Sequence, residues 1–83
     1  MDKEILLKQL SYRSNHRGCK ETDILLGVFF NQKHHEFDDK KLELYRSFIE
    51  EDDMMIYDWI LAKTEIPKKY YDLALEIKAF HRI

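Results

Sequence analysis

The sequence predicts an all-α fold, a compact five-helix bundle that forms a single domain over residues 1–83. The chain contains only two glycines and one proline, and no alternating run of β-branched residues bounded by turn signals predicts a strand. Apolar side chains instead recur at the three- and four-residue spacings of amphipathic helices. A chain this short buries only about 60% of its unfolded surface, so one modest core is expected and a large internal cleft is not.

The first two helices are expected over residues 3–14 and 19–33, joined by the basic link Asn15–Gly18. The second helix is the more apolar, so we expect it to be buried at the centre of the fold. Gly27 inside it costs about 1 kcal/mol relative to alanine, which predicts the close approach of a neighbouring helix. The apolar stripe expected to face the core consists of Ile24, Leu25, Val28 and Phe29, widened by Leu26 and Phe30.

The third and fourth helices follow the polar stretch Gln32–Phe37. We expect Asp38 or Asp39 to cap the third helix and Asp52 or Asp53 to cap the fourth, because aspartate side chains accept hydrogen bonds from the free N–H groups of a first turn. Their apolar positions are Leu42, Tyr45, Phe48 and Ile49 in the third helix, and Ile56, Tyr57, Trp59 and Ile60 in the fourth.

The fifth helix is expected to start with Thr64 as its cap and Pro67 in its first turn, where proline has no N–H to lose. Its apolar stripe runs from Tyr70 through Ala74 and Ile77 to Phe80. Among all apolar residues, we expect Trp59 to be the main anchor of the core.

Composition and charge exclude several classes of protein. Cys19 is the single cysteine, so no internal disulfide can form and a reducing compartment is expected. The sequence shows no signal or transit peptide and no run long enough to span a membrane, so we expect a cytoplasmic protein without membrane insertion. The net charge of −2 and the lack of a basic recognition helix argue against nucleic-acid binding.

Charge is distributed unevenly along the chain. Residues 1–20 hold five Lys and Arg against two acids, whereas residues 36–53 hold eight acids against three Lys and Arg. A bipolar surface of this kind suits recognition of a protein partner, and we expect the chain itself to be a monomer.

Two clusters invite a chemical interpretation, and neither supports one. His34-His35-Glu36 lacks a second ligand pair at helical spacing, so no metal site is expected. The acidic run Glu50–Asp53 is typical of a helix start, where acids favour the helix dipole, rather than of paired catalytic carboxylates. No phosphate loop or nucleophile motif is present, so we expect no catalytic residue, no bound cofactor and no enzymatic activity.

The segment HRGCKE, residues 16–21, predicts a contact surface. A helix would place Arg17 and Glu21 on one face, beside a patch of bare backbone at Gly18. The plainer alternative is a surface ion pair between the two charged side chains. The longer run LSYRSNHRGCKETDILLGVFF resembles the signature segment of the SdhE/YgfY family of succinate dehydrogenase assembly factors, whose hallmark is Arg-Gly-x-x-Glu; Arg17, Gly18 and Glu21 match it.

The resemblance covers roughly residues 8–62. It includes an aromatic residue five positions before Arg17, which is Tyr12, and the basic residue His16 directly before it. It also includes a later acid-rich turn followed by an aromatic-x-Trp sequence. The resemblance thus adds a second group of candidate partner-binding residues: Tyr12, His16, Asp52, Asp53 and Tyr57.

The family resemblance implies a five-helix fold and a role as a chaperone. The chain would bind the flavoprotein subunit of succinate dehydrogenase or fumarate reductase and promote covalent attachment of FAD to that subunit, which would hold the cofactor. Arg17 would pair with acids of the partner, Glu21 with its basic or amide groups, and Gly18 would allow close backbone approach. The alternative is a small antitoxin-like or regulatory protein-interaction module unconnected with flavin.

Overall fold

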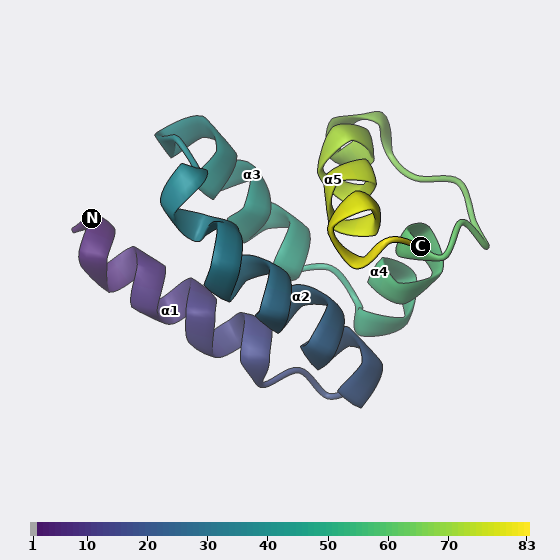
Figure 1. The fold of residues 1–83 in the computed structure, drawn as a ribbon, viewed down its shortest axis with the longest axis horizontal. Coiled ribbons are helices and arrows are strands. Elements are labelled where there is room, and N and C mark those ends of the chain that lie inside the picture. Colours follow the sequence, from purple (N-terminus) through teal and green to yellow (C-terminus); the bar gives the residue numbers. More distant parts are fainter. Residues whose placement is uncertain (1) are drawn as a thin grey trace.

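The computed structural model describes residues 2–83, which contain five α-helices, two short 3₁₀ helices and no strand (Figure 1). The predicted all-α, five-helix fold is therefore confirmed. Helices α1 and α2 lie side by side and antiparallel, and α5 stands over α4 at the other end of the molecule (Figure 1). The elements are α1 Lys3–Asn15, α2 Lys20–Lys33, η1 His34–Glu36, α3 Asp39–Ile49, α4 Asp53–Ile60, η2 Lys68–Tyr70 and α5 Tyr71–His81.

Aspartate side chains start α3 and α4, as the sequence predicts. Asp38 accepts a hydrogen bond from the Lys41 N–H at 2.8 Å, and Asp52 accepts one from the Met54 N–H at 3.1 Å. Each cap satisfies an N–H group that has no partner within its helix. Both helices therefore start at the predicted positions.

The start of the fifth helix differs from the prediction. Thr64 is exposed and lies in an irregular segment, and Pro67 precedes the 3₁₀ helix η2, so α5 begins only at Tyr71. The backbone of Pro67 is extended, with ψ of 139°, which excludes it from a helical first turn. Ala62 adopts a left-handed conformation, with φ of 59°, directly after α4. An irregular segment and the short helix η2 therefore separate α4 from α5, and no Thr64 cap starts the last helix.

The core is built around α2, with aromatic rings from α2 and α3 at its centre. The rings of Phe30 and Tyr45 stack with centroids 4.8 Å apart, and Trp59 is 3% exposed between Phe48 and Tyr70. Trp59 is thus confirmed as a core residue. The larger core side chains are Leu10, Leu26, Phe29, Phe30, Phe37, Leu42, Tyr45, Phe48, Ile49, Ile56, Trp59, Ile60, Tyr70, Leu73 and Ile77.

Gly27 packs against the last turn of α1. A Cβ atom on Gly27 would collide with the Asn15 side chain and would lie 3.4 Å from the Ser14 carbonyl oxygen. The buried Ser14 hydroxyl also shares a hydrogen bond of 2.6 Å with the Tyr45 hydroxyl, which joins α1 to α3. The predicted packing role of Gly27 is confirmed. Within residues 2–83, no helix has both the length and the apolar character needed to cross a membrane.

Candidate functional site

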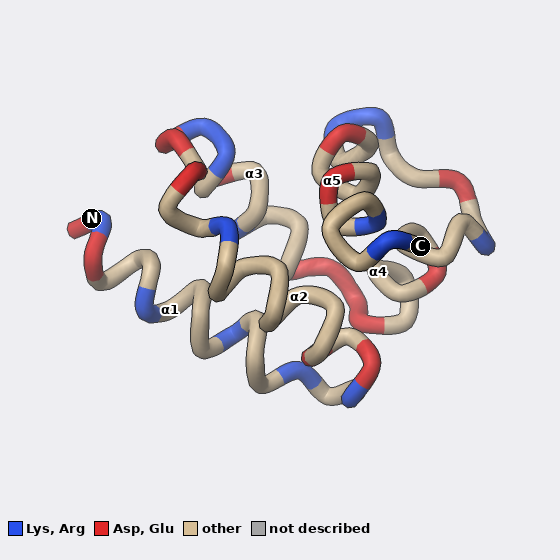
Figure 2. Tube along the Cα trace, viewed as in Figure 1, with Lys and Arg blue, Asp and Glu red and all other residues tan. Residues whose placement is uncertain are grey.

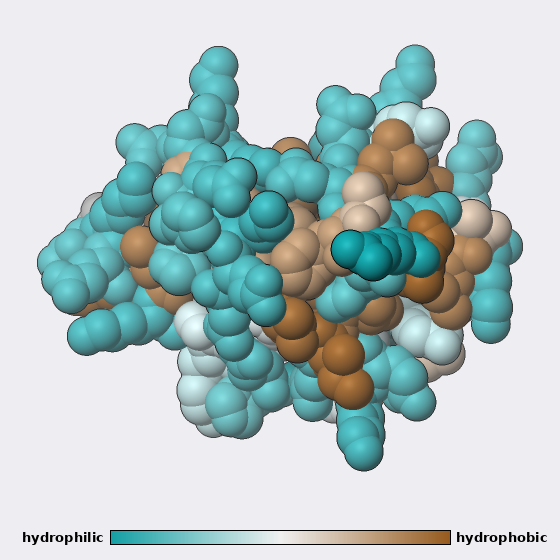
Figure 3. Space-filling model, viewed as in Figure 1, coloured by the Kyte–Doolittle hydropathy of each residue, from teal (hydrophilic) through white to brown (hydrophobic). Residues whose placement is uncertain are grey.

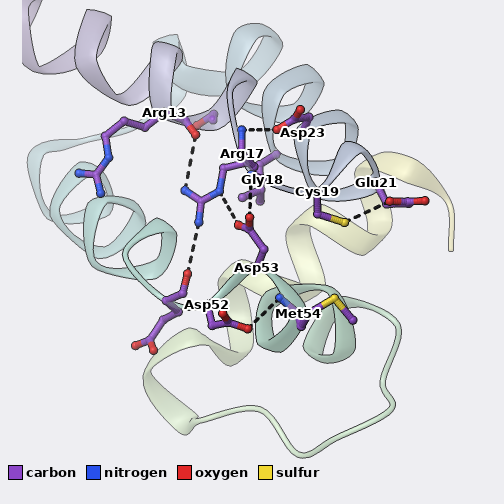
Figure 4. A network of polar contacts seen from close by, with 12 residues as sticks. Arg13, Arg17, Gly18, Cys19, Glu21, Asp23, Asp52, Asp53 and Met54 are labelled. Atoms are coloured by element: carbon purple, nitrogen blue, oxygen red, sulfur yellow. Dashed lines mark hydrogen bonds and ion pairs between the residues drawn. The ribbon is translucent and has the colours of Figure 1, made fainter.

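The link between α1 and α2 lies against the first turn of α4, and one carboxylate joins them (Figure 4). Arg17 Nε donates to Asp53 Oδ1 at 2.7 Å, and the Gly18 N–H donates to Asp53 Oδ2 at 2.9 Å. The two oxygens of Asp53 therefore hold adjacent residues of the Arg-Gly pair. We call Arg17, Gly18 and Asp53 the clasp.

Further contacts bury the arginine of the clasp. Arg17 Nη2 donates to the Glu51 carbonyl at 3.3 Å, Nη1 reaches the Arg13 carbonyl at 3.5 Å, and the Arg17 backbone N–H donates to the Asp23 carboxylate. The Arg17 side chain is only 10% exposed and that of Asp53 only 22%. Arg17 therefore donates its hydrogen bonds to groups within the molecule.

The expected placement of Arg17 and Glu21 on one helix face is wrong, and the alternative ion pair between these two residues is not formed. Arg17 lies in the link before α2 begins at Lys20, so the four-residue helical spacing does not apply to the pair. Glu21 lies in the first turn of α2 and is exposed, and its Oε2 accepts from the Cys19 thiol at 3.1 Å. This hydrogen bond lowers the pKa of Glu21 below its ordinary value because it stabilises the charged carboxylate. No Lys or Arg within residues 2–83 forms an ion pair with it.

Gly18 is exposed, and its backbone does not have a positive φ. A Cβ atom there would meet Asp53 Oδ2 at 3.4 Å, which is ordinary contact. Backbone conformation therefore does not require glycine at this position. The absence of a side chain instead leaves the backbone of the link accessible from outside, which fits the predicted role of Gly18 in close approach.

Tyr12 and His16 form an aromatic pair on the last turns of α1. Their rings stack with centroids 4.1 Å apart and 16° between the planes, while His16 Nδ1 lies 2.9 Å from the Tyr12 carbonyl oxygen. Tyr12 is 65% exposed. The pair presents a flat aromatic surface to solvent at the C-terminal end of α1, next to the clasp.

Asp52, Asp53 and Tyr57, predicted as partner contacts, occupy three different settings. Asp52 is exposed and caps α4, whereas Asp53 belongs to the clasp. Tyr57 is half-buried and lies with Glu21 at a shallow surface depression. The structure thus brings Arg17, Gly18 and Asp53 together, and separately brings Glu21 and Tyr57 together.

Two of the four acids in the run Glu50–Asp53, the first and the last, form ion pairs within the molecule. Glu50 accepts from Arg13 Nη1 at 2.7 Å, and this hydrogen bond lowers the pKa of Glu50. Figure 2 shows the acidic connection between α3 and α4 beside the end of α2 that carries the basic link. Besides capping α4 and favouring its dipole, this acidic run therefore joins α1 and the following link to α4 through the Arg13–Glu50 and Arg17–Asp53 pairs.

Two features of the site escaped the sequence analysis. Asp23 holds the backbone of Arg17, although nothing in its spacing from the link indicates this. Ile24 and Val28, expected to face the core, are 51% and 40% exposed. The stripe prediction is wrong for these two residues because α2 buries the neighbouring face that carries Leu26, Phe29 and Phe30.

Residues 8–81 match the family described as flavinator of succinate dehydrogenase. The chain belongs to this family. The matched residues include the Arg-Gly-x-x-Glu motif and continue into the last helix, α5. This family is the one that the resemblance predicted.

Curated relatives come from eukaryotes and bacteria. The chain is 35% identical over 78 residues to a protein named succinate dehydrogenase assembly factor 2, mitochondrial, of Dictyostelium discoideum, which covers 94% of this chain and 55% of the relative. It is 31% identical over 62 residues to the FAD assembly factor SdhE of Acetobacter pasteurianus, covering 75% of this chain and 57% of the relative. The chain therefore spans little more than half the length of these two relatives. No solved structure gives a significant match.

Proposed function

We propose that this chain is an assembly factor that binds the flavoprotein subunit of succinate dehydrogenase or fumarate reductase and promotes covalent attachment of FAD to it. The observation that carries the proposal is the family match over residues 8–81, together with the names of relatives from distant organisms. The exposure of Gly18 and Glu21 supports it, because both hallmark residues are accessible to a partner around the start of α2.

We propose different tasks for the hallmark residues, on the basis of their exposure and contacts. Glu21 and Gly18 are exposed and suit direct contact with the flavoprotein, as do Tyr12 and His16 on the neighbouring turn. Arg17 suits a positioning task instead, because its guanidinium already binds Asp53 and backbone carbonyls.

The chemistry asked of the complex explains why a small helical protein suffices. Joining a flavin carbon to a histidine requires the two groups to be held in reacting geometry, and it requires stabilisation of the charge that develops on the flavin. The flavoprotein holds both reactants, so we propose that the assembly factor acts as a monomer without a cofactor or enzymatic activity of its own. By binding, it favours the reactive arrangement of the flavoprotein.

The cytoplasmic location expected from the sequence stays a prediction. Relatives from Dictyostelium discoideum and Scheffersomyces stipitis are named mitochondrial, whereas the name of the Acetobacter pasteurianus relative gives no location. Cell fractionation with detection of this chain tests the prediction directly.

The experiment that tests the function uses purified flavoprotein subunit loaded with noncovalent FAD. Covalent flavin is measured by mass spectrometry with and without this chain. Wild-type chain should increase the covalent fraction, and Glu21→Ala should lose most of the increase. Glu4→Ala is the matched control, because Glu4 is also exposed and occupies the same second position of its helix, α1, that Glu21 occupies in α2. A wild-type chain that neither binds the subunit nor raises covalent flavin would favour the alternative, an interaction module unconnected with flavin.

A further inference from the structure

A shallow apolar depression lies beside the carboxylate of Glu21. Four side chains from α2 and from α4 and its C-cap line it together with Glu21, and its volume is about 250 Å³. Small-molecule sites usually measure about 300–1,000 Å³ and carry several polar groups. This depression is smaller, and apart from the Tyr57 hydroxyl its only polar group is one carboxylate, so it suits a protein side chain better than a cofactor. The apolar residues are Ile24, Leu25, Tyr57 and Leu61.

The apolar wall continues along the outer face of α2. Ile24 and Val28 are separated by one helical turn and are 51% and 40% exposed. Figure 3 shows several apolar patches among the polar side chains, and one of them lies over α2. Covering exposed aliphatic side chains with a partner stabilises the complex by about 25 cal/mol for each Å² of apolar surface removed from water.

Glu21 supplies a charge at the edge of the same depression. Its carboxylate is exposed, and within residues 2–83 its only side-chain hydrogen bond comes from the Cys19 Sγ. The adjacent Lys20 favours the charged form of Glu21, but no Lys or Arg within residues 2–83 forms an ion pair with it. The carboxylate therefore remains open to a basic group on whatever covers the depression.

We propose that this depression receives a segment of the flavoprotein subunit that carries an apolar side chain next to a lysine or arginine. The apolar side chain would lie against Ile24 and Leu61, and the basic group would pair with Glu21. This inference rests on the proposed function and extends it, because it adds Ile24 and Leu61 to the residues that recognise the partner.

Charge argues against a second copy of this chain as the occupant. A symmetric dimer over so small a patch would bring the Glu21 carboxylates of both copies toward each other. Like charges brought together at an interface oppose association, whereas a basic segment of another protein removes the conflict.

The test measures the dissociation constant between this chain and the purified flavoprotein subunit. Ile24→Asp should weaken binding at least tenfold, because it places a charge in an apolar contact, and the milder Ile24→Gln should weaken it by about threefold or more. Leu75→Asp on α5 is the matched control: Leu75 is 43% exposed, lies outside the depression and should change the constant less than twofold. Glu21→Gln should weaken binding and reduce its dependence on salt.

The outcomes separate this inference from the proposed function. Tight binding by wild type with equal binding by Ile24→Asp and Ile24→Gln overturns the inference and leaves the function standing. Absence of wild-type binding overturns the function and the inference together. A wild-type dimer in sedimentation that Ile24→Asp dissociates identifies a second copy as the occupant and also overturns the inference. Thermal melts of each variant identify any loss that comes from unfolding.

Discussion

Asp53→Ala is expected to destabilise the whole domain, because it removes the acceptor shared by Arg17 and Gly18. Removing one partner of a fully buried ion pair costs about 3–5 kcal/mol, since the remaining charge is left without compensation. Here the side chains of Arg17 and Asp53 retain 10% and 22% exposure, and Arg17 keeps the Glu51 carbonyl as an acceptor. We therefore expect a loss of about 2–3 kcal/mol in the free energy of unfolding.

A loss of this size is easily measured. In a domain of this length, about 1 kcal/mol shifts the melting temperature by about 4–8 °C, so Asp53→Ala should melt about 10–20 °C below wild type. The assay is thermal unfolding followed by circular dichroism at neutral pH. Asp53→Asn keeps an oxygen for the Gly18 N–H but loses the charge. Its melting temperature should therefore lie between those of Asp53→Ala and wild type.

Glu50→Ala is the control, because it breaks the neighbouring Arg13–Glu50 pair, in which both side chains are about half exposed. Ion pairs of this kind contribute little, so its melting temperature should stay close to that of wild type. The double variant Arg17→Ala with Asp53→Ala should be little less stable than either single variant, since the two residues act as one unit. An Asp53→Ala protein that melts together with Glu50→Ala would refute the clasp as a stabilising contact.

Three further predictions concern the core and the hallmark. Tyr45→Phe should cost about 1–3 kcal/mol by leaving the Ser14 hydroxyl buried without its partner. Burial raises the pKa of Tyr45, so above a pH of about 10 this residue ionises in the unfolded chain but not in the folded protein, and stability should fall as the pH rises. A pH series of melts should show that loss in wild type and a smaller loss in the variant. Trp59→Ala should cost about 3–5 kcal/mol and abolish cooperative melting, as differential scanning calorimetry would show, whereas a wild-type melt would mean that Trp59 does not anchor the core. Gly18→Arg should melt like wild type, because Gly18 is exposed without a positive φ, yet fail to capture the flavoprotein in a pull-down; retained capture would argue against close approach at the link.

The sequence by itself determined the features that depend on residues close together in the chain. Helical spacing of apolar residues, together with few glycines and prolines, predicted five helices, and the caps Asp38 and Asp52 act through N–H groups two or three residues away. The Arg-Gly-x-x-Glu pattern likewise identified the family without any knowledge of where its side chains point. Each of these features depends on residues within about one helical turn, where sequence spacing and distance in space are tied together.

Tertiary packing decided the partners of the hallmark residues and the exposed face of α2. Arg17 pairs with Asp53, 36 positions along the chain, because α4 docks against the link between α1 and α2. Spacing alone favoured Glu21, which forms no ion pair with a Lys or Arg of residues 2–83. Ile24 and Leu26 both belong to one apolar stretch, and only the packing of neighbouring helices buries Leu26 and leaves Ile24 in solvent. A stripe this wide fits the core in more than one rotation of the helix, so long-range contacts rather than local pattern choose between them.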